Sequence, residues 1–152
     1  MCLLTTRQTP LVAANPIRVY KVLEVMPPQL SCRTPFRHFD IAFDEEGKCE
    51  LKAEIEGQKF STGVFVVQSG IHSFRKQWAA EELTKDIAPS IHMGRHSKAK
   101  VFYAIIPTGS EYYLGEDEDI VANHMIIFKR HDLMRDYMNK QDITHRKYDT
   151  GR

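Results

Sequence analysis

Short segments rich in β-branched residues, each ended by a proline or glycine turn, are the feature that most restricts how this chain can fold. The strongest segment is residues 17–25, with the sequence Ile-Arg-Val-Tyr-Lys-Val-Leu-Glu-Val, and Pro27 and Pro28 follow it. This alternation predicts a strand with Lys21 on the same face as Val19 and Leu23. The strand ends before the prolines because proline has no amide hydrogen to donate to a neighbouring strand.

Several further segments have strand character and are joined by short turns that contain glycine or proline. Short connections favour antiparallel pairing between consecutive strands, so a meander is the economical topology. We expect these further strands at residues 39–43, 49–55, 60–67, 100–106, 111–114 and 119–128.

Two segments have helical spacing instead. Ser73 is placed to cap a helix over residues 74–87, in which Trp78 belongs to the apolar stripe. A short C-terminal helix is expected over residues 133–138, and residues 139–152 form a polar tail that we expect to be flexible. The chain is thus predicted to be one α+β domain over residues 1–138. Its mainly antiparallel sheet has about six to seven strands with one packed central helix.

Composition narrows the class of protein further. Lys and Arg number 21 against 20 for Asp and Glu, which gives a net charge of +1 and no clear nucleic-acid signal. The three cysteines are odd in number and include no Cys-x-x-Cys pair, which fits a reducing compartment. There is no export signal and no run of roughly 18 apolar residues, so we expect a cytoplasmic protein without a membrane span.

The clearest candidate ligand site is the segment Gly-Ile-His-Ser-Phe at residues 70–74. If a helix begins there, His72 and Ser73 lie where main-chain amides and the helix dipole favour an anion. The alternative is that Ser73 only caps the helix and His72 packs in the turn.

A basic and aromatic group of residues surrounds the first predicted strand. Arg33, Phe36 and Arg37 lie in the loop after it, and Tyr20 and Lys21 lie in the strand itself. Guanidinium and ammonium groups recognise phosphate, and an aromatic ring stacks on a base. Solvated loop charges are the alternative interpretation.

The other histidines and Cys2 are weaker candidates for metal-binding or catalytic sites. His92 and His96 have metal-ligand spacing, but Gly94 between them disfavours a helix, so we predict no metal site. His124 could face a cleft or be a hydrogen-bonded histidine of the core or of a sheet edge. Cys2 has the position of an N-terminal nucleophile, but no base or oxyanion site accompanies it.

Several segments together resemble small uncharacterised proteins of bacteriophages and mobile elements of gut bacteria. The resemblance spans roughly residues 1–128 and implies an accessory protein of a mobile element in the bacterial cytoplasm. It is based on Met-Cys-Leu-Leu at residues 1–4, Val-Tyr-Lys-Val-Leu at 19–23, Gly-Ile-His-Ser-Phe at 70–74 and Ile-Pro-Thr-Gly-Ser-Glu-Tyr-Tyr at 106–113.

The chain is also similar to the ADP-ribosyltransferase fold in the order of Tyr20 and Lys21, Ser73 and the strand that ends near Gly109. That resemblance implies NAD as a cofactor, which no other feature suggests. Asn123 and His124 stand where this fold has its catalytic glutamate, and Glu111 is the substitute candidate.

Three functions follow from these observations. The first is a binding protein with an anti-defence role, which sequesters a small anionic nucleotide-like ligand or binds a host protein. The second is an NAD-using transferase, although no complete catalytic set supports an enzyme. The third is a structural or virion-associated module, for which self-association into a homo-oligomer stays open.

Overall fold

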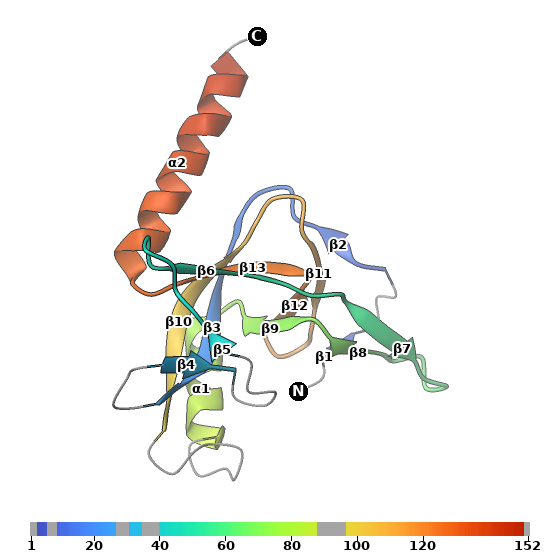
Figure 1. Ribbon diagram of the computed structural model, residues 1–152. Helices are drawn as coiled ribbons and strands as arrows, with labels where there is room; N and C mark the ends of the chain where they lie inside the picture. The colour runs from blue at the N-terminus through green and yellow to red at the C-terminus, as the bar shows by residue number, and fades with distance from the viewer. Residues whose placement is uncertain (1–2, 6–8, 27–30, 35–39, 88–96, 151–152) are drawn as a thin grey trace.

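The computed structural model describes residues 3–5, 9–26, 31–34, 40–87 and 97–150 (Figure 1). The described residues form thirteen strands and two helices. In chain order these are β1 (Leu3–Thr5), β2 (Leu11–Val12), β3 (Ile17–Met26), β4 (Ser31–Arg33), β5 (Asp40–Ile41), β6 (Lys48–Lys52), β7 (Glu56–Lys59), β8 (Phe65–Ser69), β9 (Ile71–Phe74), α1 (Gln77–Ile87), β10 (Lys98–Ile106), β11 (Glu111–Leu114), β12 (Asp119–Ala122), β13 (His124–Phe128) and α2 (His131–Thr150).

The predicted α+β class is confirmed, and every strand pairing among the described residues is antiparallel. The expected six to seven strands were too few. Several of the additional strands, such as β1, β2, β4 and β5, contain only two or three residues. A segment that short shows no alternation, so only its pairing partner identifies it as a strand.

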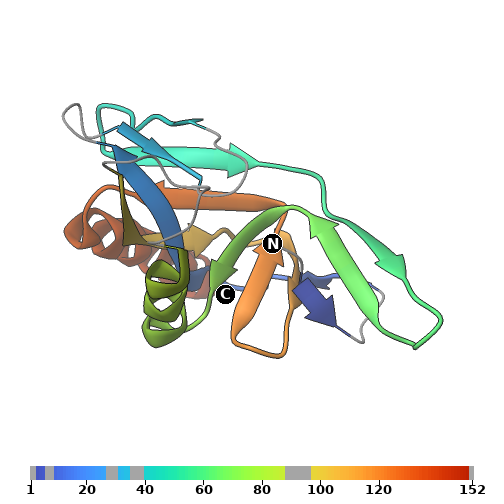
Figure 2. The same cartoon turned by 90° about the horizontal axis from the view of Figure 1, so that it is seen from below.

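The larger sheet curls back on itself. Its strands follow the order β2-β11-β12-β9-β3-β10-β13-β6, and β12 and β13 are separated in the chain only by Asn123. The path from β12 through β9, β3 and β10 to β13 therefore returns to the same chain segment, as in a small barrel. Figure 2 shows the sharp change of direction between β12 and β13.

Asn123 holds this corner with main-chain and side-chain hydrogen bonds. Its N–H donates to the Glu111 carbonyl at 3.0 Å, and its own carbonyl accepts from the Ala53 N–H at 2.9 Å. Its Oδ1 accepts from the Glu111 N–H at 3.0 Å. We expected one continuous strand over residues 119–128, which was wrong, because the chain changes sheet partners at this corner.

The interior of the curled sheet is the main hydrophobic core. It consists of alternate residues of the long strands, and the largest wholly buried members are Leu23, Ile106, Ile120, Met125 and Ile127. In β3, the core includes Val19, Leu23 and Val25, which the alternation of residues 17–25 placed on one face. The other face of β3 is also covered, since Val22 packs beneath α1.

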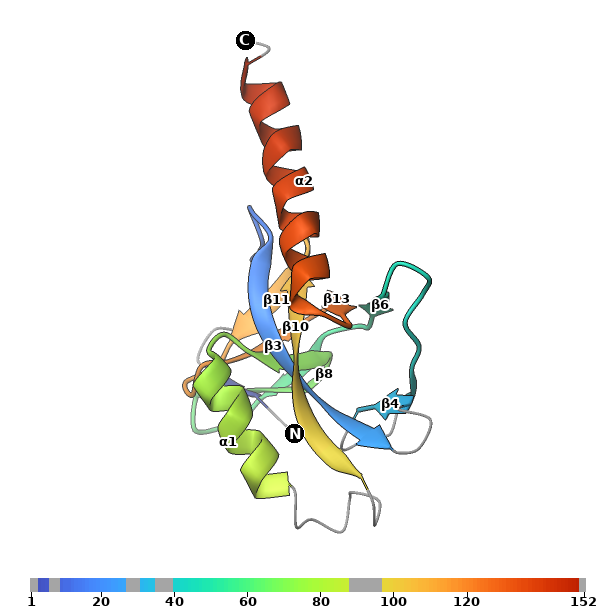
Figure 3. The same ribbon diagram turned by 90° about the vertical axis from the view of Figure 1, so that its left-hand side faces the viewer.

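Both helices pack on the outer face of the same sheet. Helix α1 covers Val22 with Ala80 and Ile87, and the first turns of α2 cover Ile105 and Phe128 with Met134. Figure 3 shows β3 and β10 side by side, with α1 against their outer face and α2 extending away from the sheet.

The first helix, α1, begins later in the chain than predicted. Ser73 belongs to β9 and is not a helix cap, because α1 starts at Gln77. Trp78 was predicted to join the apolar stripe, but its exposed fraction is 61%. Residues 71–74 pair with β12 and form a strand, so the first turn of the expected helix does not form.

The C-terminal helix is longer than predicted. Helix α2 runs from His131 to Thr150 and so includes most of the segment expected to be a polar tail. Its first turns contact the body through residues such as Leu133, Met134 and Tyr137. Neither helix in the described ranges combines the length and hydropathy needed to cross a lipid bilayer.

Candidate functional site

Two of the predicted ligand residues, Lys21 and Ser73, lie on the same inner face of neighbouring strands in the curled sheet. Strands β3 and β9 pair through Tyr20 opposite Phe74, and in an antiparallel pair the next position brings Lys21 beside Ser73. On the other side of β3, Lys21 is opposite Phe102 of β10. Both residues are on the inner face, in line with Leu23 and Ile71 of the main core.

Lys21 is unusual because it is a buried cation to which the described residues supply no counter-charge. Its exposed fraction is 8%, and no hydrogen bond or ion pair involves its Nζ within the described part of the chain. Burial disfavours the charged form and lowers the pKa of Lys21 from 10.5 to about 8. A substantial fraction of this side chain is therefore neutral in mildly alkaline solution.

Ser73 is equally buried, with an exposed fraction of 2%. Its hydroxyl finds no hydrogen-bond partner among the described residues. A buried hydroxyl without a partner is costly and uncommon in folded proteins. The position of Ser73 was predicted as a ligand contact at a helix N-terminus, whereas its actual environment is the inner face of a sheet.

Tyr20 and His72 lie on the other face of the same two strands. The ring of Tyr20 is 5.6 Å from that of Tyr103 between centroids and belongs to the cluster beneath α1. His72 is opposite Val121, on the outer face of β9 and β12. These two side chains therefore do not join Lys21 and Ser73 in one site.

Arg33 is bound to a neighbouring carboxylate. Its Nε and Nη2 donate to the two oxygens of Glu24 at 2.6 Å and 3.0 Å, across the pairing of β3 and β4. Glu24 is fully buried, and hydrogen bonding to it raises the pKa of Arg33. This ion pair occupies the guanidinium that we expected to recognise phosphate, while Phe36 and Arg37 lie outside the described residues.

Glu111 is separated from the interior pair. It is exposed at the start of β11 and is on the same face of that strand as Tyr113, which packs toward β1 and β8. The inner face of β11 consists of Tyr112 and Leu114. The residues named for NAD chemistry, Tyr20, Lys21, Ser73 and Glu111, are thus divided between the two faces of the sheet.

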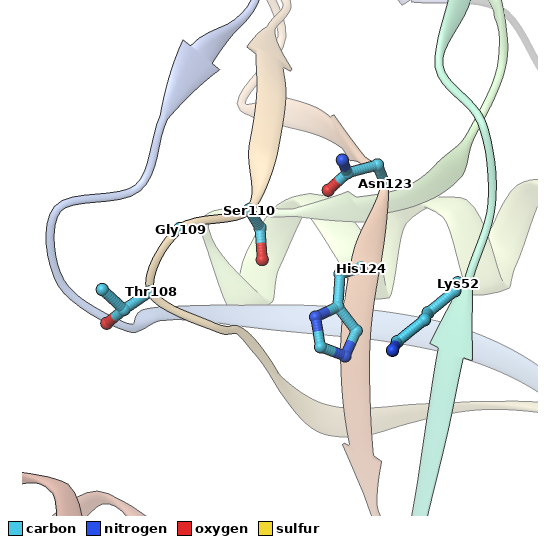
Figure 4. A pocket seen from close by; sticks show the side chains of 6 residues that line it. All are labelled: Lys52, Thr108, Gly109, Ser110, Asn123 and His124. Carbon is cyan, nitrogen blue, oxygen red and sulfur yellow. The ribbon is translucent and has the colours of Figure 1, made fainter.

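A second group of polar residues lines an open pocket at the Asn123 corner (Figure 4). The pocket has a volume of about 300 Å³ and lies between β6, the turn after β10 and the start of β13. Its lining residues are Lys52, Thr108, Gly109, Ser110, Asn123 and His124.

His124 in this pocket is oriented by a carboxylate. Its Nε2 is 2.6 Å from Glu50 Oε1, and the Lys52 Nζ is 3.9 Å from the same oxygen. Ser110 is 5% exposed, and its hydroxyl has no partner within the described ranges. Of the alternatives left open for His124, the structure shows a hydrogen-bonded histidine that lines a pocket, on a strand between β10 and β6. Lys52 and Ser110 were missed because no local motif marks them.

The remaining candidates have simpler environments. Cys32 and Cys49 form no disulfide within the described part of the chain, and burial raises the pKa of both thiols, so both are less reactive than exposed cysteines. Cys2, His92 and His96 lie outside the described residues. Within the described ranges, no three or more histidine, cysteine or acidic side chains are placed to hold a metal ion.

Comparison with known proteins adds no relative, since no family model, curated protein or solved structure matches the chain significantly. The functional argument therefore depends on the two sites described above.

Proposed function

We propose that this protein acts by binding a small anionic, nucleotide-like ligand, whose charged group is held by Lys21 and Ser73. In keeping with the resemblance to phage and mobile-element proteins, the role would be to sequester such a molecule in the cytoplasm of a bacterial host. The supporting observation is that Lys21 and Ser73 lie on the same inner face of adjacent strands, that both residues are largely buried, and that neither side chain has a partner among the described residues.

The energetics of Lys21 favour the binding of an anion. Removing an ammonium from water costs several kcal/mol unless an opposite charge or hydrogen bonds compensate it. Lys21 has no such compensation among the described residues, and the lowered pKa of about 8 reflects that cost. A bound anion would supply the counter-charge and return the lysine to its charged form.

Ser73 would orient the bound anion through a hydrogen bond. Its hydroxyl donates one hydrogen bond, and an anionic oxygen accepts it readily. The ammonium and the hydroxyl lie on adjacent strands of a sheet, which hold them at a defined separation. Together they would provide charge and hydrogen bonding for one phosphate or carboxylate group.

Calorimetric titration at pH 8 tests the proposal, with adenosine monophosphate, a cyclic dinucleotide and inorganic phosphate as ligands. About half of Lys21 is neutral at that pH, so binding an anion beside it takes up roughly half a proton per ligand. Repeating the titration in buffers of different ionisation enthalpy measures that uptake. An anion bound only at the surface would cause no comparable proton uptake.

Lys21→Met and Ser73→Ala are the informative variants, and Lys59→Met is the matched control because Lys59 is exposed on β7. Lys21→Met should abolish both binding and proton uptake, and Ser73→Ala should weaken binding while proton uptake persists. Binding that survives in Lys21→Met, or an absence of binding by every ligand, would refute this function. The second outcome would direct the search to a host protein.

A further inference from the structure

The pocket at the Asn123 corner is separate from the interior pair. Lys21 is opposite Phe102, whereas the pocket begins after Ile106, at the end of the same strand. Four residues along a strand correspond to about 13 Å. The pocket therefore has its own set of chemical groups, independent of Lys21 and Ser73.

The hydrogen bond to Glu50 determines what His124 offers to a ligand. An ionised carboxylate only accepts hydrogen bonds, so the proton of a neutral His124 is on Nε2, 2.6 Å from Glu50. The other ring nitrogen, Nδ1, is then an acceptor. In Figure 4 that nitrogen is on the side of the ring that faces Thr108 and Ser110, across the pocket from Lys52.

Lys52 and Ser110 add donors to this acceptor. The Lys52 ammonium extends toward His124, and the Ser110 hydroxyl points into the pocket (Figure 4). The Ser110 oxygen is buried and has no partner among the residues described, so a bound molecule that reaches it would supply the missing hydrogen bond. The pocket thus combines the Lys52 ammonium, the Ser110 hydroxyl and, in neutral His124, an acceptor at Nδ1, while the Glu50 carboxylate lies beside both Lys52 and His124.

We propose that this pocket binds a small hydroxylated anion, in which a phosphate or carboxylate faces Lys52 and Ser110 while a neighbouring hydroxyl donates to His124 Nδ1. A simple anion without a hydroxyl would accept from Lys52 and Ser110 but would leave His124 Nδ1 without a hydrogen bond. The volume of about 300 Å³ suits a sugar phosphate or a short hydroxy acid.

Isothermal titration with ribose 5-phosphate, lactate and sulfate tests the assignment. We expect saturable binding of ribose 5-phosphate or lactate at millimolar concentrations, and at least tenfold weaker binding of sulfate, which has no hydroxyl to donate. Whichever hydroxylated ligand binds more tightly identifies the anionic group. Lys52→Met and Ser110→Ala should each weaken that binding about tenfold, a difference of about 1.4 kcal/mol.

Two further variants distinguish binding in this pocket from binding at the interior pair or at an exposed lysine elsewhere. Lys98→Met, which changes an exposed lysine on β10, and Lys21→Met should both leave the affinity unchanged. Equal affinity for sulfate would refute the role of His124, and absence of saturable binding would refute the site. Loss of binding in Lys21→Met with retention in Ser110→Ala would overturn this assignment and place the ligand at the interior pair.

Discussion

Replacing Lys21 with methionine should stabilise the protein at neutral pH. The folded state lowers the pKa of Lys21 from 10.5 to about 8, so the unfolded chain binds more protons than the folded one between these values. A pKa difference of this size corresponds to roughly 3 kcal/mol of destabilisation, which is fully present below pH 8. Methionine has a similar length and no charge, so it removes this penalty.

The pH dependence distinguishes this mechanism from better packing by methionine. As pH rises through the window from about 8 to 10.5, the folded wild-type protein regains the stability that its charged lysine had removed. The advantage of Lys21→Met should therefore fall from about 3 kcal/mol at pH 7 to about 1 kcal/mol at pH 10. A gain from apolar packing alone would be the same at both values.

Urea denaturation of both proteins at the two pH values, after exhaustive dialysis to remove bound anions, measures the difference. Lys59→Met serves as the control and should match the wild-type protein throughout, because Lys59 is exposed in β7. A stability difference between Lys21→Met and wild type that does not change with pH would refute the reasoning.

Three other substitutions test the fold by urea denaturation. Arg33→Met should cost about 3 kcal/mol because it removes the bidentate partner of the buried Glu24, and a loss below 1 kcal/mol would contradict a structural role for this pair. Gly70→Ala should cost at least about 2 kcal/mol, since Gly70 has a φ of 129° and an added Cβ would lie 2.5 Å from a Val121 methyl; unchanged stability would refute that close approach. Trp78→Gln should change stability by less than about 0.5 kcal/mol because the ring is largely exposed, and a large loss would mean that it packs.

The alternation of residues 17–25 was sufficient to predict β3 and the division of its side chains between two faces, with Lys21 on the face of Val19 and Leu23. The structure shows that this face points into the core. The prediction succeeded because side-chain direction in a strand is a local property with a period of two. The antiparallel class was predicted from the short turns between strands, but the predicted meander was wrong, because β11 and β12 are, among the described strands, the only neighbours on the main path of the larger sheet that follow one another in the chain. The hydrogen-bond partner of His124, Glu50, is 74 positions away and could not be predicted from local sequence.

Pairing between strands far apart in the chain decided the positions of the site residues that local sequence did not predict. Ser73 has a sequence environment typical of a helix cap, yet pairing with β12 and β3 makes residues 71–74 a strand and brings Ser73 beside Lys21. Arg33 and Glu111 looked like available charges until pairing brought one to Glu24 and turned the other away from the interior. Local sequence determined which side chains share a face of each strand, whereas the closure of the sheet determined which faces meet, because that choice depends on the burial of the whole core.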